Sequence, residues 1–255
     1  MEHEEYCARA GAEITRMAEV TVSAALETPV PTCPGWDLAK LIKHTGIVHR
    51  WATATVATKA TERVAADALD AGLPAEVAGY PRWLAAGGAS LLTVLREAGP
   101  GLPVWSWAAD DGGSGWWARR MLHETMVHRV DAELSLGIEP SLDPVAAADG
   151  VSEFLLNARL GSRPSQRLAE LPAGQTVHLH ATDDGLGSGG EWLISLGGDA
   201  GYTWSHGHAK AAVAVRGPAA LLLLLAYGRV KPDDGRLTVF GDASLLTTWQ
   251  DIMTL

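Results

Sequence analysis

The sequence predicts a helical bundle followed by a small domain of mixed helices and strands. In the first half of the chain, apolar residues recur three or four positions apart over long segments, which is typical of packed helices. In the second half, short segments alternate between apolar and polar residues and are separated by Gly- and Asp-rich turns. The composition changes at residues 139–144. We therefore expect a four-helix bundle over residues 1–143 and a small α+β domain over residues 144–255.

Four helices are predicted in the first half. The first covers residues 4–26 and ends before a segment with two prolines. Asp37 is expected to cap the second helix, because its carboxylate can accept hydrogen bonds from the N–H groups at a helix start. The third covers residues 76–98, although two adjacent glycines are unfavourable in its middle. Ser114 is expected to cap the fourth helix.

The second half mixes helices with strands. The expected elements are a helix at 145–160, strands at 176–180, 191–196 and 211–215, a helix at 218–227, a strand at 237–240 and a helix at 242–253. His178 and His180 lie two positions apart and share one face of their strand, so they could bind a metal. A sheet edge that faces solvent is the favoured interpretation for both. His206 and His208 are expected in a turn.

Composition limits the class of protein and its partners. A chain of 255 residues can form one large domain or two ordinary ones, each with its own core. Hydrophobic residues make up 47% of it, which indicates a globular protein. The formal net charge of −10 argues against nucleic acid and anionic membranes as partners, because phosphate binding needs a basic face.

The sequence also predicts a cytoplasmic location. The first residues are acidic where a signal peptide is basic. The longest apolar run, residues 218–227, has about half the length of a membrane span. Cys7 and Cys33 are too few and too far apart to indicate a disulfide scaffold or a thiolate zinc site, and a reducing compartment would keep them as thiols.

The fourth predicted helix carries acid and imidazole where a buried helix normally carries leucine. At helical period, one stripe contains Trp117, Met121, Glu124, His128 and Asp131. Burying a carboxylate beside an imidazole costs several kcal/mol unless a partner charge or a metal compensates. The stripe therefore predicts a charged partner or a metal ion.

The second predicted helix supplies a further ligand. His44 falls between Leu41 and Val48 at the same helical spacing, so it should face inward. If the two helices pack side by side, His44, Glu124 and His128 converge inside the bundle. Two histidines and one glutamate are ligand types that suit zinc, and three protein ligands leave a coordination position open, as in catalytic sites.

Helical spacing makes two other histidines weaker candidates for metal ligands. His49 and His123 each lie five residues from His44 or His128, on a more polar face of their helix. His123-Glu124 and His128 do not match the zinc-protease signature, because that motif needs histidines four residues apart and these two are five apart. An alternative to the metal site stays open, since a histidine and a glutamate on an apolar face often form only a core hydrogen bond.

Several short motifs resemble one known family. They are CPGWD at residues 33–37, LIKH at 41–44, ETMVHRVD at 124–131, RGPAAL at 216–221, YGR at 227–229 and GDA at 241–243. In this order and over nearly the whole chain they resemble the mycothiol-dependent maleylpyruvate isomerase family. The resemblance implies a DinB-like four-helix bundle followed by a small α/β domain of sterol-carrier type. It also implies that His44, Glu124 and His128 hold zinc or another divalent metal.

The resemblance further implies an activity. Mycothiol is the thiol cofactor, and zinc would deprotonate it. The thiolate then adds to a cis double bond conjugated to carbonyls, the adduct rotates, and elimination gives the trans isomer. Arg229 matches the arginine that the isomerase brings from its second domain to the charge that develops. A helix-end interaction is the alternative role for Arg229. Asp131 could accept the other ring N–H of His128 and so orient it.

Two alternative functions stay open at this level. A mycothiol S-transferase would use the same nucleophile, but the thiol would stay on the small electrophile that it attacks. A small-molecule binding module with a structural metal site would need no thiol at all. The sequence determines neither the substrate nor the oligomeric state.

Overall fold

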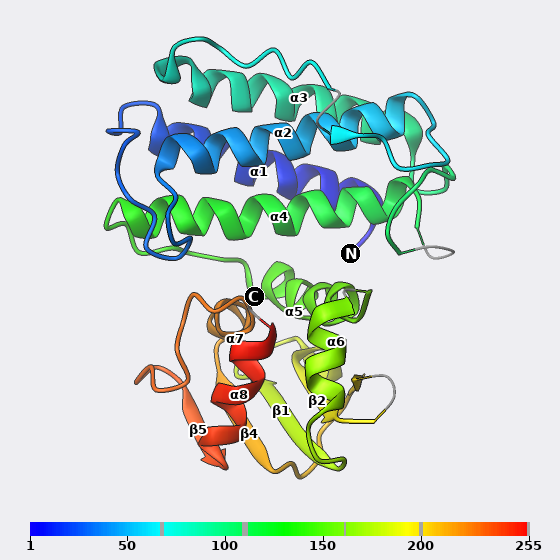
Figure 1. The fold of residues 1–255 in the computed structure, drawn as a ribbon, viewed down its shortest axis with the longest axis vertical. Coiled ribbons are helices and arrows are strands. Elements are labelled where there is room, and N and C mark those ends of the chain that lie inside the picture. The colour runs from blue at the N-terminus through cyan, green and yellow to red at the C-terminus, as the bar shows by residue number, and fades with distance from the viewer. Residues whose placement is uncertain (67–68, 109–111, 161, 199–200, 254–255) are drawn as a thin grey trace. The chain divides into compact units, whose positions relative to one another are not determined.

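The computed structural model describes residues 1–66, 69–108, 112–160, 162–198 and 201–253. The chain divides into two compact units, Met1–Pro140 and Ser141–Leu255, each of which is drawn in Figure 1. The change of composition at residues 139–144 coincides with this division. The helical first region and the mixed second region that the sequence predicts are both present.

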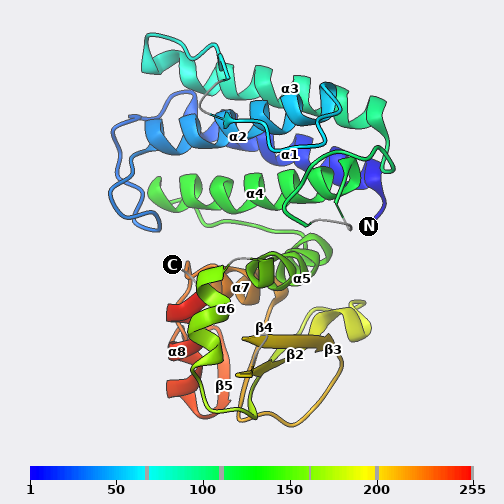
Figure 2. The same ribbon diagram turned by 45° about the vertical axis from the view of Figure 1, so that its right-hand side comes forward.

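The first unit is a bundle of four helices. They are α1 (His3–Thr21), α2 (Leu38–Ala57), α3 (Tyr80–Ala98), preceded by a short 3-10 turn at Val77–Gly79, and α4 (Ser114–Ser135). Both α1 and α2 pack against α3 and α4 (Figures 1 and 2). None of the described helices combines the length and the apolar composition that a membrane crossing requires.

Helix starts show where local sequence determines the structure and where it does not. Asp37 caps α2 as predicted, because its carboxylate accepts a hydrogen bond from the N–H of Lys40 at 2.8 Å. The prediction for Ser114 is wrong, since Gly113 occupies the cap position of α4. The Ser114 hydroxyl instead donates to the carbonyl of Gly99 and accepts from the N–H of Leu102. It therefore ties the preceding loop to the start of α4.

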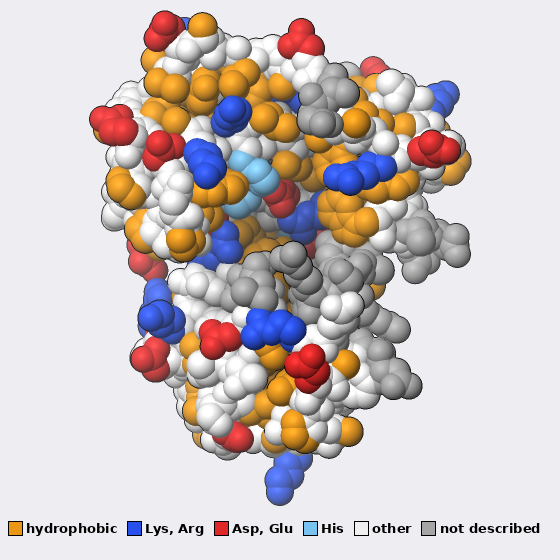
Figure 3. Space-filling view, viewed as in Figure 1, with side chains coloured by type: hydrophobic (Ala, Val, Ile, Leu, Met, Phe, Trp, Pro, Cys, Tyr) orange, Lys and Arg blue, Asp and Glu red, His pale blue; other side chains and the backbone are white. Residues whose placement is uncertain are grey.

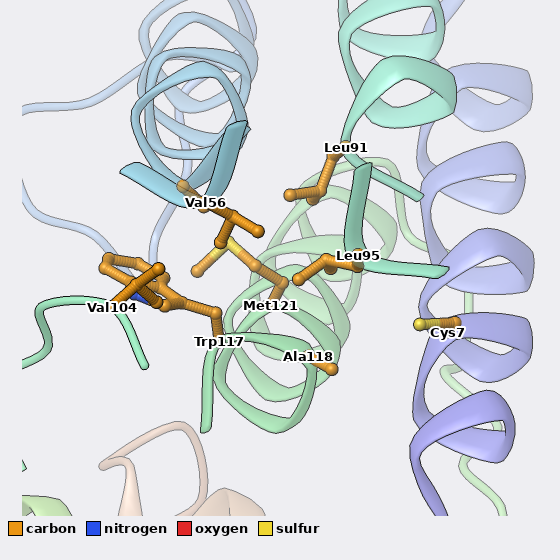
Figure 4. Close-up of a cluster of buried hydrophobic side chains, with 9 residues drawn as sticks. Cys7, Val56, Leu91, Leu95, Val104, Trp117, Ala118 and Met121 are labelled. Atoms are coloured by element: carbon orange, nitrogen blue, oxygen red, sulfur yellow. The ribbon is translucent and has the colours of Figure 1, made fainter. Parts of the chain in front are cut away.

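The core of the first unit joins all four helices. Figure 4 shows part of it, with side chains of Cys7, Val56, Leu91, Leu95, Val104, Trp117, Ala118 and Met121 in one cluster. The two glycines in the middle of α3 permit a close approach of helices, because a Cβ at Gly88 would lie 2.6 Å from the Ile14 side chain of α1. This packing offsets the low helix propensity of glycine.

The second unit combines a five-stranded sheet with helices. Its elements are α5 (Pro144–Leu160), α6 (Ser162–Ala169), β1 (Gln175–Ala181), a 3-10 turn at Gly187–Gly190, β2 (Glu191–Leu196), β3 (Tyr202–His206), β4 (Val213–Gly217), α7 (Ala219–Ala226), β5 (Thr238–Gly241) and α8 (Ala243–Met253). The strand order is β3-β2-β1-β4-β5, with β1 and β4 parallel and the other neighbours antiparallel. The helices gather on one side of the sheet (Figures 1 and 2).

Two elements of the second unit were not predicted, and two expectations about its histidines are wrong. Helix α6 and strand β3 were not predicted, and His206 lies at the end of β3 rather than in a turn. Strand β1 is the central strand, so the solvent-facing edge predicted for His178 and His180 is wrong. His178 is only 2% exposed. The alternation that placed both histidines on one face was correct, but alternation alone does not tell a central strand from an edge strand.

Candidate functional site

Three side chains of the first unit converge at one point. One turn of α4 places Glu124 and His128 on the same side of the helix, and α2 supplies His44. The Oε1 atom of Glu124 lies 3.0 Å from Nε2 of His44 and 3.4 Å from Nε2 of His128. The structure thus brings together the three residues singled out by helical spacing in the sequence.

Asp131 orients His128. Its Oδ2 atom lies 2.9 Å from Nδ1 of His128, one turn along α4, and the Asp131 side chain is fully buried. The thiol of Cys33 donates to the same oxygen at 3.4 Å. Because Nδ1 of His128 is held by the carboxylate, Nε2 is turned toward Glu124, which is the arrangement of a histidine that binds a metal through Nε2.

Charged neighbours set the ionisation of the cluster. Burial acts to raise the pKa of Glu124, but the Arg120 guanidinium and hydrogen bonds from His128 and His44 hold that pKa well below its usual range. Burial acts to lower the pKa of His128, but the hydrogen bond to Asp131, with those to Cys33 and Glu124, holds it well above its usual range. Glu124 is therefore a carboxylate at neutral pH, and a metal that binds His128 must displace a proton.

An aromatic side chain forms one wall of the site. The ring of Trp36 lies 5.0 Å from that of His44 and 6.2 Å from that of His128, centroid to centroid, and it is stacked on the latter. The His44 side chain is 37% exposed, whereas Glu124 and His128 are mostly buried. Figure 3 shows histidine, acidic and basic side chains side by side on one face of the first unit. The site is thus open on the side of His44.

His49 and His123 do not join the cluster, but the reason differs from the predicted one. Both are fully buried, so the expectation that they lie on a polar face is wrong. Nε2 of His49 lies 2.9 Å from the Thr125 hydroxyl, which itself donates to the carbonyl of Met121. His49 must therefore donate to Thr125. Burial lowers the pKa of His49 to about 4, so its ring is neutral at neutral pH.

The donor set fits a divalent transition metal. The ligand atoms of His44, Glu124 and His128 all lie within 4.8 Å of one another. Imidazole and carboxylate ligands suit zinc and other divalent first-row transition metals, and three protein ligands leave a coordination position for an exchangeable ligand. Cys33, His128 and Asp131 also meet this distance criterion. That second set is less suited to an exchangeable ligand, because Asp131 is fully buried and already bonded to His128.

Arg229 belongs to the second unit. It follows α7 in the Tyr227-Gly228-Arg229 turn, where Gly228 has a φ of 73° that favours glycine. One guanidinium nitrogen, Nη1, donates to the Tyr227 carbonyl at 2.7 Å, and the guanidinium lies 5.8 Å from the centre of the Tyr227 ring. These contacts match the helix-end role that the sequence left open, while its role toward a substrate stays a prediction.

Three residues that contribute to the site, Arg120, Cys33 and Trp36, were not among the predicted ligands. Arg120 could have been found, because it lies four residues before Glu124 on the same helix. Cys33 and Trp36 belong to the segment before α2, and their contacts with Asp131 and His128 span most of the first unit's sequence. No local sequence pattern predicts contacts between residues this far apart in the chain, although Cys33 and Trp36 both fall within the motif at residues 33–37.

Comparisons with known proteins identify the family and a similar fold. The sequence matches the family model described as "Mycothiol maleylpyruvate isomerase N-terminal domain" over residues 7–133, and the "MDMPI C-terminal domain" model over residues 146–248. Two solved structures have a similar fold at 15% sequence identity: a mycothiol-dependent maleylpyruvate isomerase, with a TM-score of 0.57, and a mutant of it, with a TM-score of 0.59. Both similarities cover 94% of this chain and 93% of the other. None of the curated proteins matches the sequence significantly.

Proposed function

Because this chain belongs to the mycothiol maleylpyruvate isomerase family and is an enzyme of the isomerase type, we propose that it catalyses a mycothiol-dependent cis–trans isomerisation. The substrate is a small unsaturated acid of the maleylpyruvate type. His44, Glu124 and His128 hold a divalent metal, for which zinc is the first choice. The observation that carries this proposal is the approach of two imidazole Nε2 atoms to one oxygen of Glu124, at 3.0 and 3.4 Å.

The protein's own residues prepare the ligand set. Asp131 fixes the ring of His128 so that Nε2 is presented to the site. Arg120 pairs with Oε2 of Glu124 and leaves Oε1 directed at the two histidines. When bound, a divalent metal lowers the pKa of a coordinating thiol, so that the thiol is a nucleophilic thiolate at neutral pH.

The open side of the site determines what can reach it. His44 is the most exposed of the three ligands, and Trp36 stands beside it. A small thiol and a planar conjugated acid can approach on this side, where the Trp36 ring offers an apolar surface. Trp117, Met121 and Asp131, on the same stripe of α4, are fully buried, which limits access by water from the other side.

Arg229 is proposed to act on the substrate. Addition of a thiolate to a double bond conjugated with a carbonyl places negative charge on the carbonyl oxygen, and a guanidinium stabilises such charge. A planar guanidinium also binds a carboxylate through two hydrogen bonds. This role is inferred from the resemblance of residues 227–229 to the family, and the activity of Arg229 variants tests it.

A direct assay tests the proposed function. Metal-stripped protein is reloaded with zinc, incubated with mycothiol and maleylpyruvate, and analysed by chromatography with mass spectrometry. We expect the trans isomer to form only when zinc and mycothiol are both present, and the His44→Ala variant to form none. An accumulating adduct of thiol and substrate would instead establish an S-transferase. Zinc binding with neither product would contradict an enzymatic role for this site.

A further inference from the structure

A second cluster of histidines and a glutamate lies in the second unit. His178 and His180 come from the central strand β1, Glu191 begins β2, and His208 follows β3. All three imidazoles approach the same carboxylate oxygen. Oε2 of Glu191 lies 2.7 Å from Nδ1 of His208, 3.2 Å from Nε2 of His178 and 3.6 Å from Nδ1 of His180.

The sheet register explains why these side chains meet. His180 is the direct partner of Glu191 across the antiparallel pair β1–β2, so both side chains project from the same face. His178, two residues earlier on β1, projects from that face as well. The alternate residues, such as Val177 and Leu179, form the buried apolar row of the other face.

The segment after β3 adds the fourth member. His206 pairs with Trp192 and therefore projects from the opposite face to Glu191. Gly207 then adopts a φ of 131°, in the region that favours glycine, and its N–H donates to the Glu191 carbonyl at 3.3 Å. This bend brings His208 back to the carboxylate of Glu191, although 74% of the His208 side chain stays exposed.

One buried nitrogen of the cluster makes no hydrogen bond to the described part of the chain. Nε2 of His178 is buried and has no hydrogen-bond partner in the part of the chain that the structure describes. It lies close to Glu191 Oε2, but the direction of approach does not make a hydrogen bond. A buried polar atom without a hydrogen-bond partner destabilises the folded state, so the position of this nitrogen needs another source of stabilisation.

We propose that His178, Glu191 and His208 form a second binding site for a divalent transition metal, with His180 as an additional ligand. Nε2 of His178, Oε2 of Glu191 and Nδ1 of His208 lie within 4.8 Å of one another. Imidazole nitrogens with one carboxylate oxygen are ligands that suit zinc. A cation among these atoms gives the buried nitrogen of His178 a partner.

Four protein ligands are characteristic of structural rather than catalytic zinc. A metal here joins the central strand, its neighbour β2 and the segment that follows β3. Its binding energy therefore stabilises the second unit, because the unfolded chain does not present the ligands together. The site lies in a different unit from His44, Glu124 and His128, and it does not depend on the function proposed for them.

Zinc titration of matched variants tests this site. His44→Ala weakens the first site, and His208→Ala or His206→Ala is added to this background. His206 is the matched control, because it is an exposed histidine two residues away whose Nδ1 contacts the Glu191 backbone carbonyl rather than its carboxylate. After dialysis against buffered zinc, we expect the His208→Ala protein to hold one equivalent less than the His206→Ala protein.

Thermal unfolding gives a second measurement on the same samples. Added zinc should raise the melting temperature of the second unit in the His206→Ala protein and not in the His208→Ala protein. In the presence of a chelator both variants should melt alike, since both substitutions are on the surface. Equal zinc content in the two variants would overturn the proposal. If both variants held equally less zinc than the His44→Ala protein, surface histidines would be binding zinc adventitiously, and this result would also overturn the proposal.

Discussion

The two histidine–glutamate clusters differ in how the fold assembles them. In the first unit, a single turn of α4 supplies Glu124 and His128, and only His44 has to come from another helix. In the second unit, the ligands come from two strands and a following segment, so their meeting depends on strand register. Sequence spacing consequently predicted the first cluster, whereas the second could be recognised only once the sheet order was known.

The surroundings of the two clusters differ as well. Glu124 has Arg120 on one side, and His128 is anchored by the buried carboxylate of Asp131. Glu191 faces imidazoles, the outermost of which, His208, is largely exposed. A ligand set with charged anchors and an open aromatic side suits chemistry on a small molecule. A set that bridges two strands and a loop suits a structural tie.

Removing ligands of the first cluster should have the largest effect. We expect His44→Ala, Glu124→Ala and His128→Ala each to reduce zinc at this site sharply and to abolish turnover, because too few protein ligands remain. Metal content and activity are measured on the same samples, in a His208→Ala background that removes the proposed second site.

The buried histidines of the first unit serve as controls for that experiment. His49→Ala and His123→Ala should leave zinc nearly stoichiometric, since neither residue is in the convergent group. Any loss of stability in these variants is monitored by circular dichroism. Full zinc content in the His44, Glu124 and His128 variants would show that these residues do not hold the metal.

The second unit should affect the reaction through Arg229 and not through its histidines. We expect Arg229→Ala to lower turnover about 10²- to 10³-fold with zinc content near wild type, as for loss of one donor to a developing oxyanion. Arg229→Lys should restore only part of the rate, because an ammonium cannot make the planar two-pronged contact. His208→Ala is the matched comparison and should retain the wild-type rate in steady-state assays. Normal turnover in Arg229→Ala would confine the chemistry to the first unit.

Stability at low pH should report the burial of His49. Its pKa is lowered to about 4 by burial, against 6.5 for the ordinary side chain, so the unfolded chain takes up a proton at a higher pH than the folded one. The contribution of His49 to stability therefore falls as the pH falls from 6.5 toward 4. We expect roughly 2 to 3 kcal/mol of this loss to disappear in His49→Gln, which keeps a donor for Thr125. Urea unfolding at pH 7 and pH 4.5 with a chelator measures it, and an equal loss in both proteins would contradict the assignment.

Much of the fold was readable from the sequence because helical periodicity and apolar alternation are local. The four helices of the first unit, the cap by Asp37 and the face shared by Glu124, His128 and Asp131 all follow from spacing. The errors concern tertiary surroundings. His49 turned out to be buried because the second helix packs on more than one side, and a strand of alternating residues does not reveal its neighbours in the sheet.

Asp131 should have a smaller effect than the ligands themselves. It holds Nδ1 of His128 at 2.9 Å but takes no part in the convergent group of His44, Glu124 and His128. We expect Asp131→Asn to weaken zinc binding about 10- to 100-fold, as is typical when the partner of a metal-bound histidine is altered. Competition with a chelator of known affinity measures this change. Unchanged affinity would reduce Asp131 to a buried helix residue without influence on the site.

Cobalt substitution can show whether the first cluster binds the thiol, because cobalt has a visible spectrum that zinc lacks. The protein with His208→Ala is loaded with one equivalent of cobalt, and mycothiol is then added. If the thiol binds at the site of His44, Glu124 and His128, a new sulfur-to-cobalt charge-transfer absorption should appear, and it should be absent when His44→Ala is added. A cobalt spectrum that does not change on addition of mycothiol would contradict the proposal that this site activates the thiol.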